Sequence, residues 1–317
     1  MNKWTKIGLV VGMGTATVAT AHLVNKLIFS SATSKKLTDI DKRLTYNWKF
    51  GNISYTVKGE GLPLLLIHDL QSTGSSYEWK NIVNNLSKKR TVYAIDLLGC
   101  GYSDKPNITY TTYMYTQLIN DFVVNVINKR TDVIATGDAA PLTIMAGYLN
   151  PAIFDKIVLV SPQSVKNAMI IPDKKSNIRR VLLNSPILGT MIYNICMSKK
   201  KTEQNFINKL FFNSKAANSE LIDAYYENSH LYGSSAKFLY TSCVCHYTTA
   251  TISKALEKLD NCIYIISGKE SDNASSTASE YTSLNPAIEV AFVENAKHLP
   301  QLEQPKKFVE LVKIFIG

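Results

Sequence analysis

The chain has 317 residues, of which 45% are hydrophobic and 19% charged, which excludes a disordered protein and allows one large or two small globular domains. The net charge of +10 is concentrated in two segments: residues 1–44 hold seven basic and two acidic residues, and residues 163–245 hold eleven and five. Neither segment shows the aromatic-interleaved basic stripe of a nucleic-acid-binding surface, so we expect no nucleic acid partner and favour an anionic membrane surface.

The N-terminal segment is predicted to anchor the protein in a membrane. Residues 7–29 follow a short basic start and are mostly apolar, and Lys26 can extend toward the interface. A cleaved signal peptide ending at residues 19–21 (Ala-Thr-Ala) is the competing interpretation. We favour the anchor because apolar residues resume after Ala21. Residues 1–35 are therefore treated as an anchor and linker outside the globular fold, on an undetermined side of the membrane, with the basic residues after the segment favouring the cytoplasmic face.

From residue 45 onward, short β-rich runs alternate with amphipathic helices, which predicts a mostly parallel sheet with helices on both faces. The expected strands are residues 53–57, 64–68, 91–96, 133–136, 157–160, 262–267 and 288–293, and the expected helices are 78–87, 113–127, 139–149, 252–259 and 307–316. Residues 164–245 interrupt this alternation with a basic, helical pattern. We interpret this insertion as a lid over the carboxyl ends of the strands, set into a core of residues 45–163 and 246–317.

Residues 133–140 have the strand, tight turn and helix of a nucleophile elbow, whose usual pattern is Gly-x-Ser-x-Gly. Counted back from the end of the following helix at Asn150, the nucleophile position falls on Gly137, which has no hydroxyl. A shift of one residue places Asp138 there. Asp138 is then either a carboxylate nucleophile or the N-cap of the following helix, and we favour the N-cap.

Several segments together resemble the α/β-hydrolase family, over residues 48–316. Residues 61–69 resemble the strand and His-Gly turn before the oxyanion hole, and residues 96–106 are similar to the family's Asp-x-x-Gly-x-Gly-x-Ser segment. Residues 262–268 resemble the strand before the catalytic acid, and residues 295–305 resemble the loop with the catalytic histidine. The resemblance implies an α/β-hydrolase fold with a helical lid, descended from ester or acyl hydrolases.

The resemblance also implies roles for single residues. His298 takes the position of the general base, and His68 that of the structural histidine in the His-Gly turn. The backbone N–H of Leu70 is expected in the oxyanion hole, and Asp69, which replaces the usual glycine, is expected to crowd it.

The triad acid is expected shortly after Gly268. The usual offset falls on Ser271, so Glu270 or Asp272 would have to substitute, and both also fit the pattern of solvated loop carboxylates. The five cysteines have no zinc-type spacing, so no metal site is expected, and nothing indicates another cofactor.

Whether this protein is an enzyme therefore depends on the elbow. We predict a membrane-associated protein, weakly active or non-catalytic, that binds an apolar or lipid-like small molecule. The alternative is a divergent hydrolase with Asp138 as nucleophile and His298 as base, similar to haloalkane dehalogenase and epoxide hydrolase relatives. The sequence fixes neither the ligand nor the oligomeric state.

Overall fold

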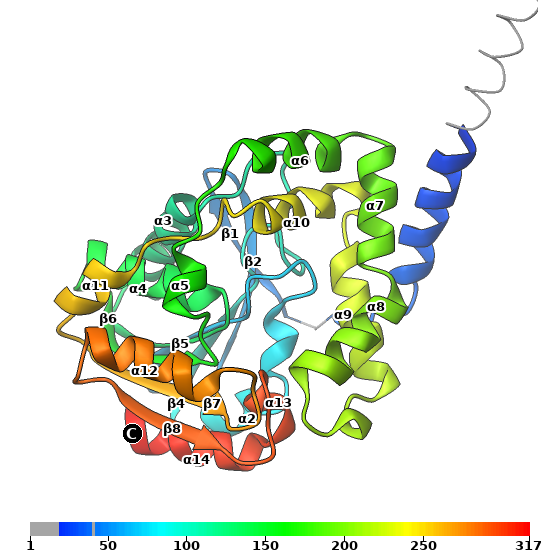
Figure 1. Ribbon diagram of the computed structural model, residues 1–317. Helices are drawn as coiled ribbons and strands as arrows, with labels where there is room; N and C mark the ends of the chain where they lie inside the picture. Colours follow the sequence, from blue (N-terminus) through cyan, green and yellow to red (C-terminus); the bar gives the residue numbers. More distant parts are fainter. Residues whose placement is uncertain (1–18, 40–41) are drawn as a thin grey trace, which may run out of the picture.

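The computed structural model describes residues 19–39 and 42–317 (Figure 1). In this part of the chain an eight-stranded sheet has the strand order β1-β2-β4-β3-β5-β6-β7-β8. β2 is antiparallel to β1 and β4, and the other neighbouring strands are parallel. The predicted mostly parallel sheet is confirmed. The strands are β1 (Leu44–Trp48), β2 (Gly51–Lys58), β3 (Leu62–Ile67), β4 (Arg90–Ile95), β5 (Thr131–Thr136), β6 (Phe154–Val160), β7 (Cys262–Gly268) and β8 (Glu289–Val293).

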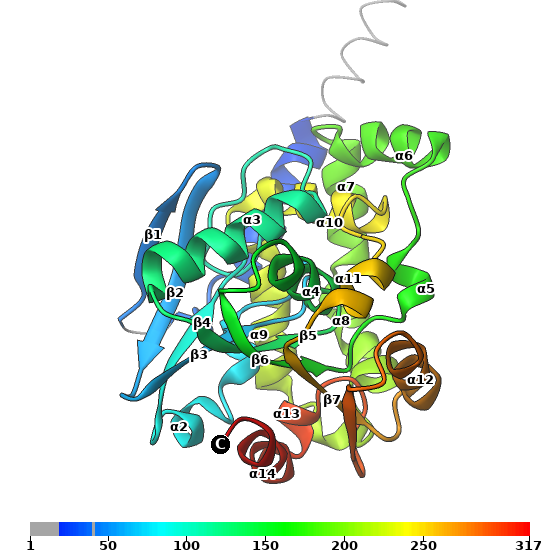
Figure 2. The same cartoon turned by 90° about the vertical axis from the view of Figure 1, so that its left-hand side faces the viewer.

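Helices cover both faces of the sheet, as Figure 2 shows. One core cluster joins the sheet to α3 (Thr112–Phe122), α4 (Ala139–Leu149) and α11 (Ser253–Lys258). A second cluster on the other face joins it to α2 (Val83–Leu86) and α14 (Pro305–Ile316). The central strands β3, β5 and β6 are almost wholly buried, as expected for parallel strands covered on both sides.

Some predicted elements differ from the observed ones. The single helix expected over residues 78–87 is a 3₁₀ turn (Ser76–Trp79) followed by the short α2. The 3₁₀ turn starts early because the N–H of Ser76 donates to the buried Asp96 carboxylate at 2.6 Å. The helix expected over residues 113–127 ends as α3 at Phe122 and continues as one wider π turn. Strand β1 and the helices α12 (Ala274–Leu284) and α13 (Pro300–Glu303) were not expected.

Between β6 and α11 the described chain forms helices rather than strands. They are α5 (Val165–Ala168), α6 (Lys174–Asn184), α7 (Leu188–Cys196), α8 (Lys199–Asn205), α9 (Ser219–His230) and α10 (Lys237–Val244). Residues of α8 and α9 line a cavity together with Asp138 at the carboxyl end of β5. The inserted helices therefore contribute one wall of the space above the sheet.

Residues 19–39 pack on these inserted helices, whereas residues 1–35 were expected to lie outside the globular fold; residues 1–18 of that prediction lie outside the described part of the chain. Residues 19–32 form a helix, in which Asn25 accepts a hydrogen bond from Asn194 of α7 at 2.8 Å and Phe29 contacts the ring of His230. Residues 33–39 and 42–43, here called the strap, follow this helix, and Glu227 of α9 accepts hydrogen bonds from the N–H and hydroxyl of Thr38. Polar side chains in the presumed linker thus have specific partners, which composition alone did not indicate.

The predicted anchor is only partly described, because its residues 7–18 lie outside the described part of the chain. Within residues 19–39 and 42–317, no helix combines the length and apolar character needed to cross a bilayer.

Candidate functional site

Gly137 occupies the turn between β5 and α4 with a φ of +55°. This left-handed conformation is uncommon for residues other than glycine and is consistent with the strained turn of a nucleophile elbow. The N–H of Gly137 donates to the carbonyl of Val160 at 2.9 Å, which holds the turn against β6. The backbone of the elbow is therefore present without a nucleophilic side chain.

The carboxylate of Asp69 fills the place that this side chain would occupy. An ideal Cβ on Gly137 would lie 2.4 Å from Oδ1 of Asp69, closer than any normal contact. The same oxygen accepts a hydrogen bond of 2.8 Å from the N–H of Asp138. In an elbow the residue after the nucleophile supplies one oxyanion-hole N–H, so this donor is already occupied by Asp69.

His298 lies in the loop between β8 and α13 and faces the same carboxylate. Its Nε2 is 3.3 Å from Oδ2 of Asp69. Burial would lower the pKa of His298, but its hydrogen bond to Asp69 and the charges of Asp69, Glu78 and Asp138 raise it above the ordinary value. The structure thus brings together His298, Asp69 and Gly137, with Asp69 as the hydrogen-bond partner of the histidine.

Asp138 is the N-cap residue of α4 by position, but its side chain makes no capping hydrogen bond. The side-chain part of our N-cap interpretation is therefore wrong. The carboxylate instead accepts a hydrogen bond of 2.7 Å from Gln71, which follows the Asp69 turn and draws it away from the helix N-terminus. Burial and the charge of Asp69 raise the pKa of Asp138 to about 7.

Glu78 is a site residue that sequence reasoning missed. It is 1% exposed, its Oε2 accepts the N–H of Asp69 at 3.2 Å, and its Oε1 accepts the side chain of Gln301 at 2.8 Å. Burial and the charge of Asp69 raise the pKa of Glu78 to about 7. In the sequence Glu78 looks like a solvated residue at a helix start, and only the tertiary fold turns it inward.

The expected acids after β7 are not brought to the histidine. Asp272 is exposed at the cavity edge, and Glu270 is half-buried, with its backbone N–H donating to Ala296. Within the described residues, neither carboxylate makes a hydrogen bond to His298. Ser271, at the usual acid position, lines the cavity with a hydroxyl that has no hydrogen-bond partner in this part of the chain.

Leu70 follows Asp69 and buries its side chain in the core. Its predicted role depends on its backbone N–H and stays a prediction. Across residues 19–39 and 42–317, no three or more His, Cys, Asp or Glu side chains are grouped to hold a metal ion.

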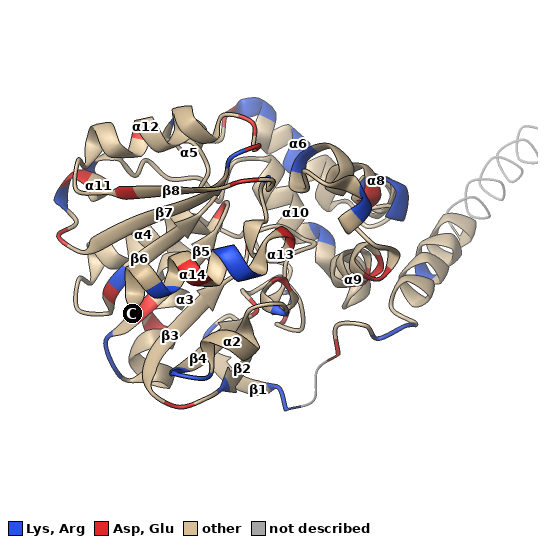
Figure 3. Cartoon of the chain, turned by 90° about the horizontal axis from the view of Figure 1, so that it is seen from below, with Lys and Arg blue, Asp and Glu red and all other residues tan. Residues whose placement is uncertain are grey.

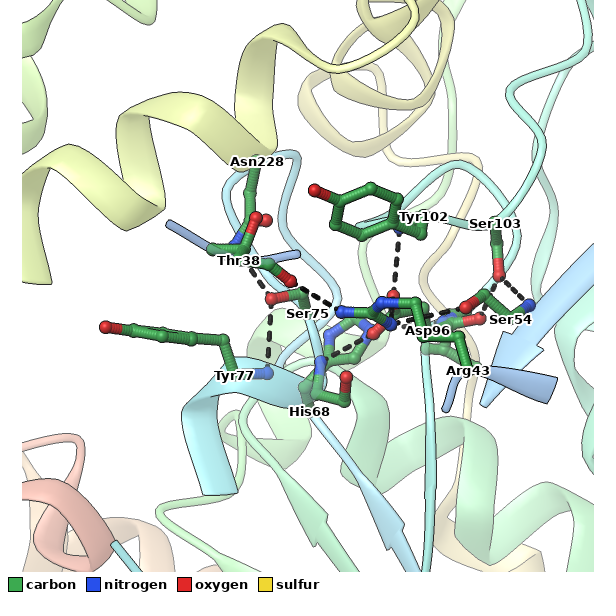
Figure 4. A network of polar contacts seen from close by, with 12 residues as sticks. Thr38, Arg43, Ser54, His68, Ser75, Tyr77, Asp96, Tyr102, Ser103 and Asn228 are labelled. Atoms are coloured by element: carbon green, nitrogen blue, oxygen red, sulfur yellow. Dashed lines mark hydrogen bonds and ion pairs between the residues drawn. The ribbon is translucent and has the colours of Figure 1, made fainter. Parts of the chain in front are cut away.

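A buried network supports the turn that carries Asp69 (Figure 4). His68 accepts the N–H of Leu97 at Nε2, 3.1 Å away, and its Nδ1 lies 2.7 Å from the carbonyl of Asp69. Burial lowers the pKa of His68, which favours the neutral ring that these two contacts need. Beside it, the Asp96 carboxylate pairs with Arg43 of the strap at 3.0 Å. The strap is thereby tied to the floor of the site.

A cavity of about 470 Å³ opens beside these groups. The Asp69 turn, the elbow and the inserted helices line it, with a mostly polar surface that includes Asp69, Gln71, Glu78, Asp138, Asn205, Lys209, Tyr225, Asp272 and His298. A second cavity of about 540 Å³ shares Asp138 and His298 and extends between the ends of β6 and β7. The site therefore has room for a small molecule next to Asp69 and His298.

Comparison with known proteins identifies relatives of the fold. A model of the alpha/beta hydrolase family matches residues 64–311. An uncharacterized protein of Mycobacterium tuberculosis is 28% identical over 112 residues, which are 35% of this chain and 32% of that protein. The chain thus spans about a third of the length of the first curated relatives it matches.

Two longer similarities cover most of the chain. A proline iminopeptidase of Heyndrickxia coagulans is 22% identical over 276 residues, which are 82% of this chain and 92% of that protein. The crystal structure of a serine hydrolase involved in carbazole degradation aligns with a TM-score of 0.71 and 15% identity, covering 87% of this chain and 98% of its own. At this identity the structural likeness establishes the fold alone.

Proposed function

The chain belongs to the alpha/beta hydrolase family, and from this premise we propose that it is a non-catalytic member that binds a small molecule beside His298. The observation that carries the proposal is the position of Asp69. Its carboxylate stands where a nucleophilic side chain would stand, and it takes the N–H of Asp138 that would otherwise stabilise an oxyanion. A serine-type acyl transfer lacks both its nucleophile and one free oxyanion-hole donor.

The cavity lining narrows the class of ligand. Burial, and after it the charge of Asp69, raises the pKa of both Glu78 and Asp138. The buried hydroxyl of Tyr225 has no hydrogen-bond partner within the described residues. A ligand with a positively charged or hydrogen-bonding group would relieve the repulsion and satisfy the hydroxyl. Of the apolar or lipid-like ligand expected from the sequence, we therefore favour the lipid-like, amphiphilic kind, or a polar ligand, over an apolar one.

Membrane attachment through residues 7–29 is the second part of the proposal. It is supported by the apolar, uncharged sequence of residues 7–21. Recovery of the mature chain beginning at His22 in a soluble fraction would contradict it and favour a cleaved signal peptide.

The binding proposal is tested by activity-based labelling and by ligand binding to the full chain. A fluorophosphonate probe should leave the protein unlabelled, and a panel of esters should not be hydrolysed above background. Primary amines of increasing length should raise the melting temperature, and Asp69→Asn should weaken this effect while Asp272→Asn at the exposed cavity edge should not. Stoichiometric labelling of a serine in the cavity would refute the proposal.

A carboxylate-nucleophile hydrolase is the second candidate function, and the contacts of Asp69 suit it better than those of Asp138. Oδ2 of Asp69 faces His298, whereas the Asp138 carboxylate is bound by Gln71 and is half-neutral near pH 7. In this chemistry Oδ2 attacks an electrophilic carbon, the leaving group departs with the bonding electron pair, and an ester forms on Asp69.

The second step restores the carboxylate. His298 takes a proton from a water molecule, whose oxygen attacks Cγ of Asp69, and the negative charge on Oδ1 is stabilised by the N–H of Asp138. The ester C–O bond then breaks, and the alcohol leaves with the proton from His298. Incubation of His298→Ala with alkyl halides or epoxides, followed by peptide mass spectrometry, would locate a trapped ester on Asp69 or on Asp138. An unmodified protein after such incubation supports the non-catalytic proposal.

A further inference from the structure

Exposed apolar side chains are concentrated on one part of the surface. Residues 23–27 and 169–195 hold twelve of the twenty-four exposed large hydrophobic residues of the described chain. Six of them define what we call the apolar face: Leu23 and Leu27 on the N-terminal helix, Ile178 and Val181 on α6, and Leu188 and Ile195 on α7. Such a concentration is unusual for a surface that faces only water.

The face is a property of ordered helices rather than of loops. In α7, Leu188 and Ile195 lie two turns apart on the exposed side, while Tyr193 and Asn194 on the other side are buried. In α6, Ile178 is 72% exposed and Val181 is 69% exposed, three residues apart, while Leu183 is buried. Each helix thus packs one side against the protein core and exposes a second set of apolar side chains on its other side.

The three helices are neighbours in the molecule. Asn194 of α7 donates to Asn25 of the N-terminal helix, and α6 packs against α7. Between them lies a mostly apolar groove of about 670 Å³, whose lining includes Phe29, Ile187 and Phe238. In Figures 1 and 2, α6 and the beginning of the helix of residues 19–32 lie at the same end of the molecule. The three helices that carry the exposed apolar side chains therefore adjoin one another.

Basic residues accompany the apolar face. α6 begins with the exposed Lys174 and Lys175, and the sequence of α6 contains no acidic residue. In Figure 3, positions occupied by Lys and Arg, coloured blue, lie on both α6 and α8. Arg179 donates a hydrogen bond to the carbonyl of Val244, whereas Lys174 and Lys175 are exposed and form no ion pair within residues 19–39 and 42–317, although the charge of Lys175 acts on the neighbouring Asp173. Apolar side chains flanked by Lys and Arg are typical of surfaces that enter the headgroup layer of anionic membranes.

We infer that the apolar face rests in the headgroup region of an anionic lipid bilayer, so that α6 and α7 contact lipid together with the N-terminal segment. A bilayer is favoured over a protein partner because the apolar sequence of residues 7–18 leads directly into the helix that carries Leu23 and Leu27. The positive charge of the same region complements anionic headgroups. This inference rests on the proposed membrane attachment and adds a second, folded contact to it.

The test places an environment-sensitive fluorescent amino acid at one position of the full chain at a time. Ile178 and Ile195 probe the apolar face, and Ile314 on α14, which is 74% exposed, is the matched control. The protein is mixed with vesicles of phosphatidylcholine containing one-third phosphatidylserine. We expect a blue shift and quenching by spin-labelled lipid at positions 178 and 195, and neither effect at position 314.

The outcomes separate the two proposals. If the protein sediments with vesicles but positions 178 and 195 respond no more than position 314, the inference is refuted and attachment by residues 7–29 stands. If the protein fails to sediment with vesicles at low salt, the proposed attachment fails and the inference with it. A second variant, Lys174→Gln with Lys175→Gln, should reduce the response at position 178 at least twofold on the anionic vesicles, and an unchanged response would contradict the role of the lysines.

Discussion

A serine at position 137 should be accommodated without a large loss of stability only if Asp69 is replaced at the same time. In Gly137→Ser, the new Cβ would lie 2.4 Å from Oδ1 of Asp69, so the carboxylate has to leave its hydrogen bond with the N–H of Asp138. Losing a hydrogen bond to a charged group costs about 1.5–3 kcal/mol. A left-handed conformation in a residue with a Cβ adds about 1–2 kcal/mol. The single substitution should therefore lower the free energy of unfolding by roughly 3–5 kcal/mol.

The cost should be smaller when Asp69 is replaced by the family's glycine. In Asp69→Gly the space above Gly137 is empty, so adding the serine costs only the backbone term of about 1–2 kcal/mol. The two substitutions should then be coupled by about 2 kcal/mol, well above the 0.3–0.5 kcal/mol scatter of independent sites. Urea unfolding of the parent, the two single variants and the double variant at one pH measures this coupling.

Two results would refute this reasoning. Additivity of the two substitutions within that scatter would mean that the Asp69 carboxylate does not compete with a side chain at position 137. A fluorophosphonate probe supplies an independent readout, since only the double variant joins a serine at position 137 to an unoccupied N–H of Asp138 beside His298. Labelling of Gly137→Ser alone, at the rate of the double variant, would show that Asp69 moves aside at little cost.

Three further predictions concern stability. Because the pKa of Glu78 in the folded protein, about 7, lies above its ordinary value of 4.5, folding takes up a proton, and the contribution of Glu78 to stability should be largest at low pH and fall by about 3 kcal/mol as pH rises from about 4.5 through 7; urea midpoints of Glu78→Gln should show a decline smaller by that amount, the remainder coming from Asp138, whose pKa is also about 7, and an equal decline in variant and parent would contradict the assignment. Arg90 pairs with the buried Asp132 at 2.5 Å and donates to the carbonyl of Ile316, so Arg90→Ala should cost about 3–5 kcal/mol, whereas Lys58→Ala at an exposed contact should be nearly neutral. Glu227→Ala should release the strap and expose it to proteolysis without changing the far-UV circular dichroism of the core, and an uncleaved strap would show that the Thr38 contacts are dispensable.

Much of the fold is predictable because the local pattern of apolar residues matches the burial of those residues in the folded protein. Parallel strands buried on both faces are continuous apolar runs, and the helix over residues 139–149 was predicted with the bounds that α4 has. Prediction failed where the sequence carries no periodic signal. α12 consists largely of Ala, Ser and Thr, and β1 at the sheet edge exposes most of its residues, so neither shows a strong apolar pattern.

The N-terminal segment illustrates a different limit. Its apolar sequence indicated a membrane, and the polar residues after it indicated a free linker, yet Asn25 and Thr38 are buried and hydrogen-bonded to the inserted helices. A polar side chain in a solvated linker and one that meets a partner across the fold look the same in a single sequence. The distinction depends on Asn194 and Glu227, which lie about 170 and 190 residues away along the chain.

The site shows why two sequence departures have to be considered as a pair. Gly137 and Asp69 each depart from the family pattern in a different motif, and taken separately one removes a nucleophile while the other crowds the oxyanion hole. The two residues have to be considered together because the carboxylate of Asp69 occupies the space that a side chain at position 137 would need. With glycine at position 137, the Asp69 carboxylate accepts a hydrogen bond from the N–H of Asp138 and contacts His298. The space beside the turn is then occupied, and the N–H of Asp138 has a hydrogen-bond partner. Glycine at position 137 and aspartate at position 69 therefore form one packing arrangement, in which a carboxylate from the neighbouring loop occupies the space of a side chain on the elbow.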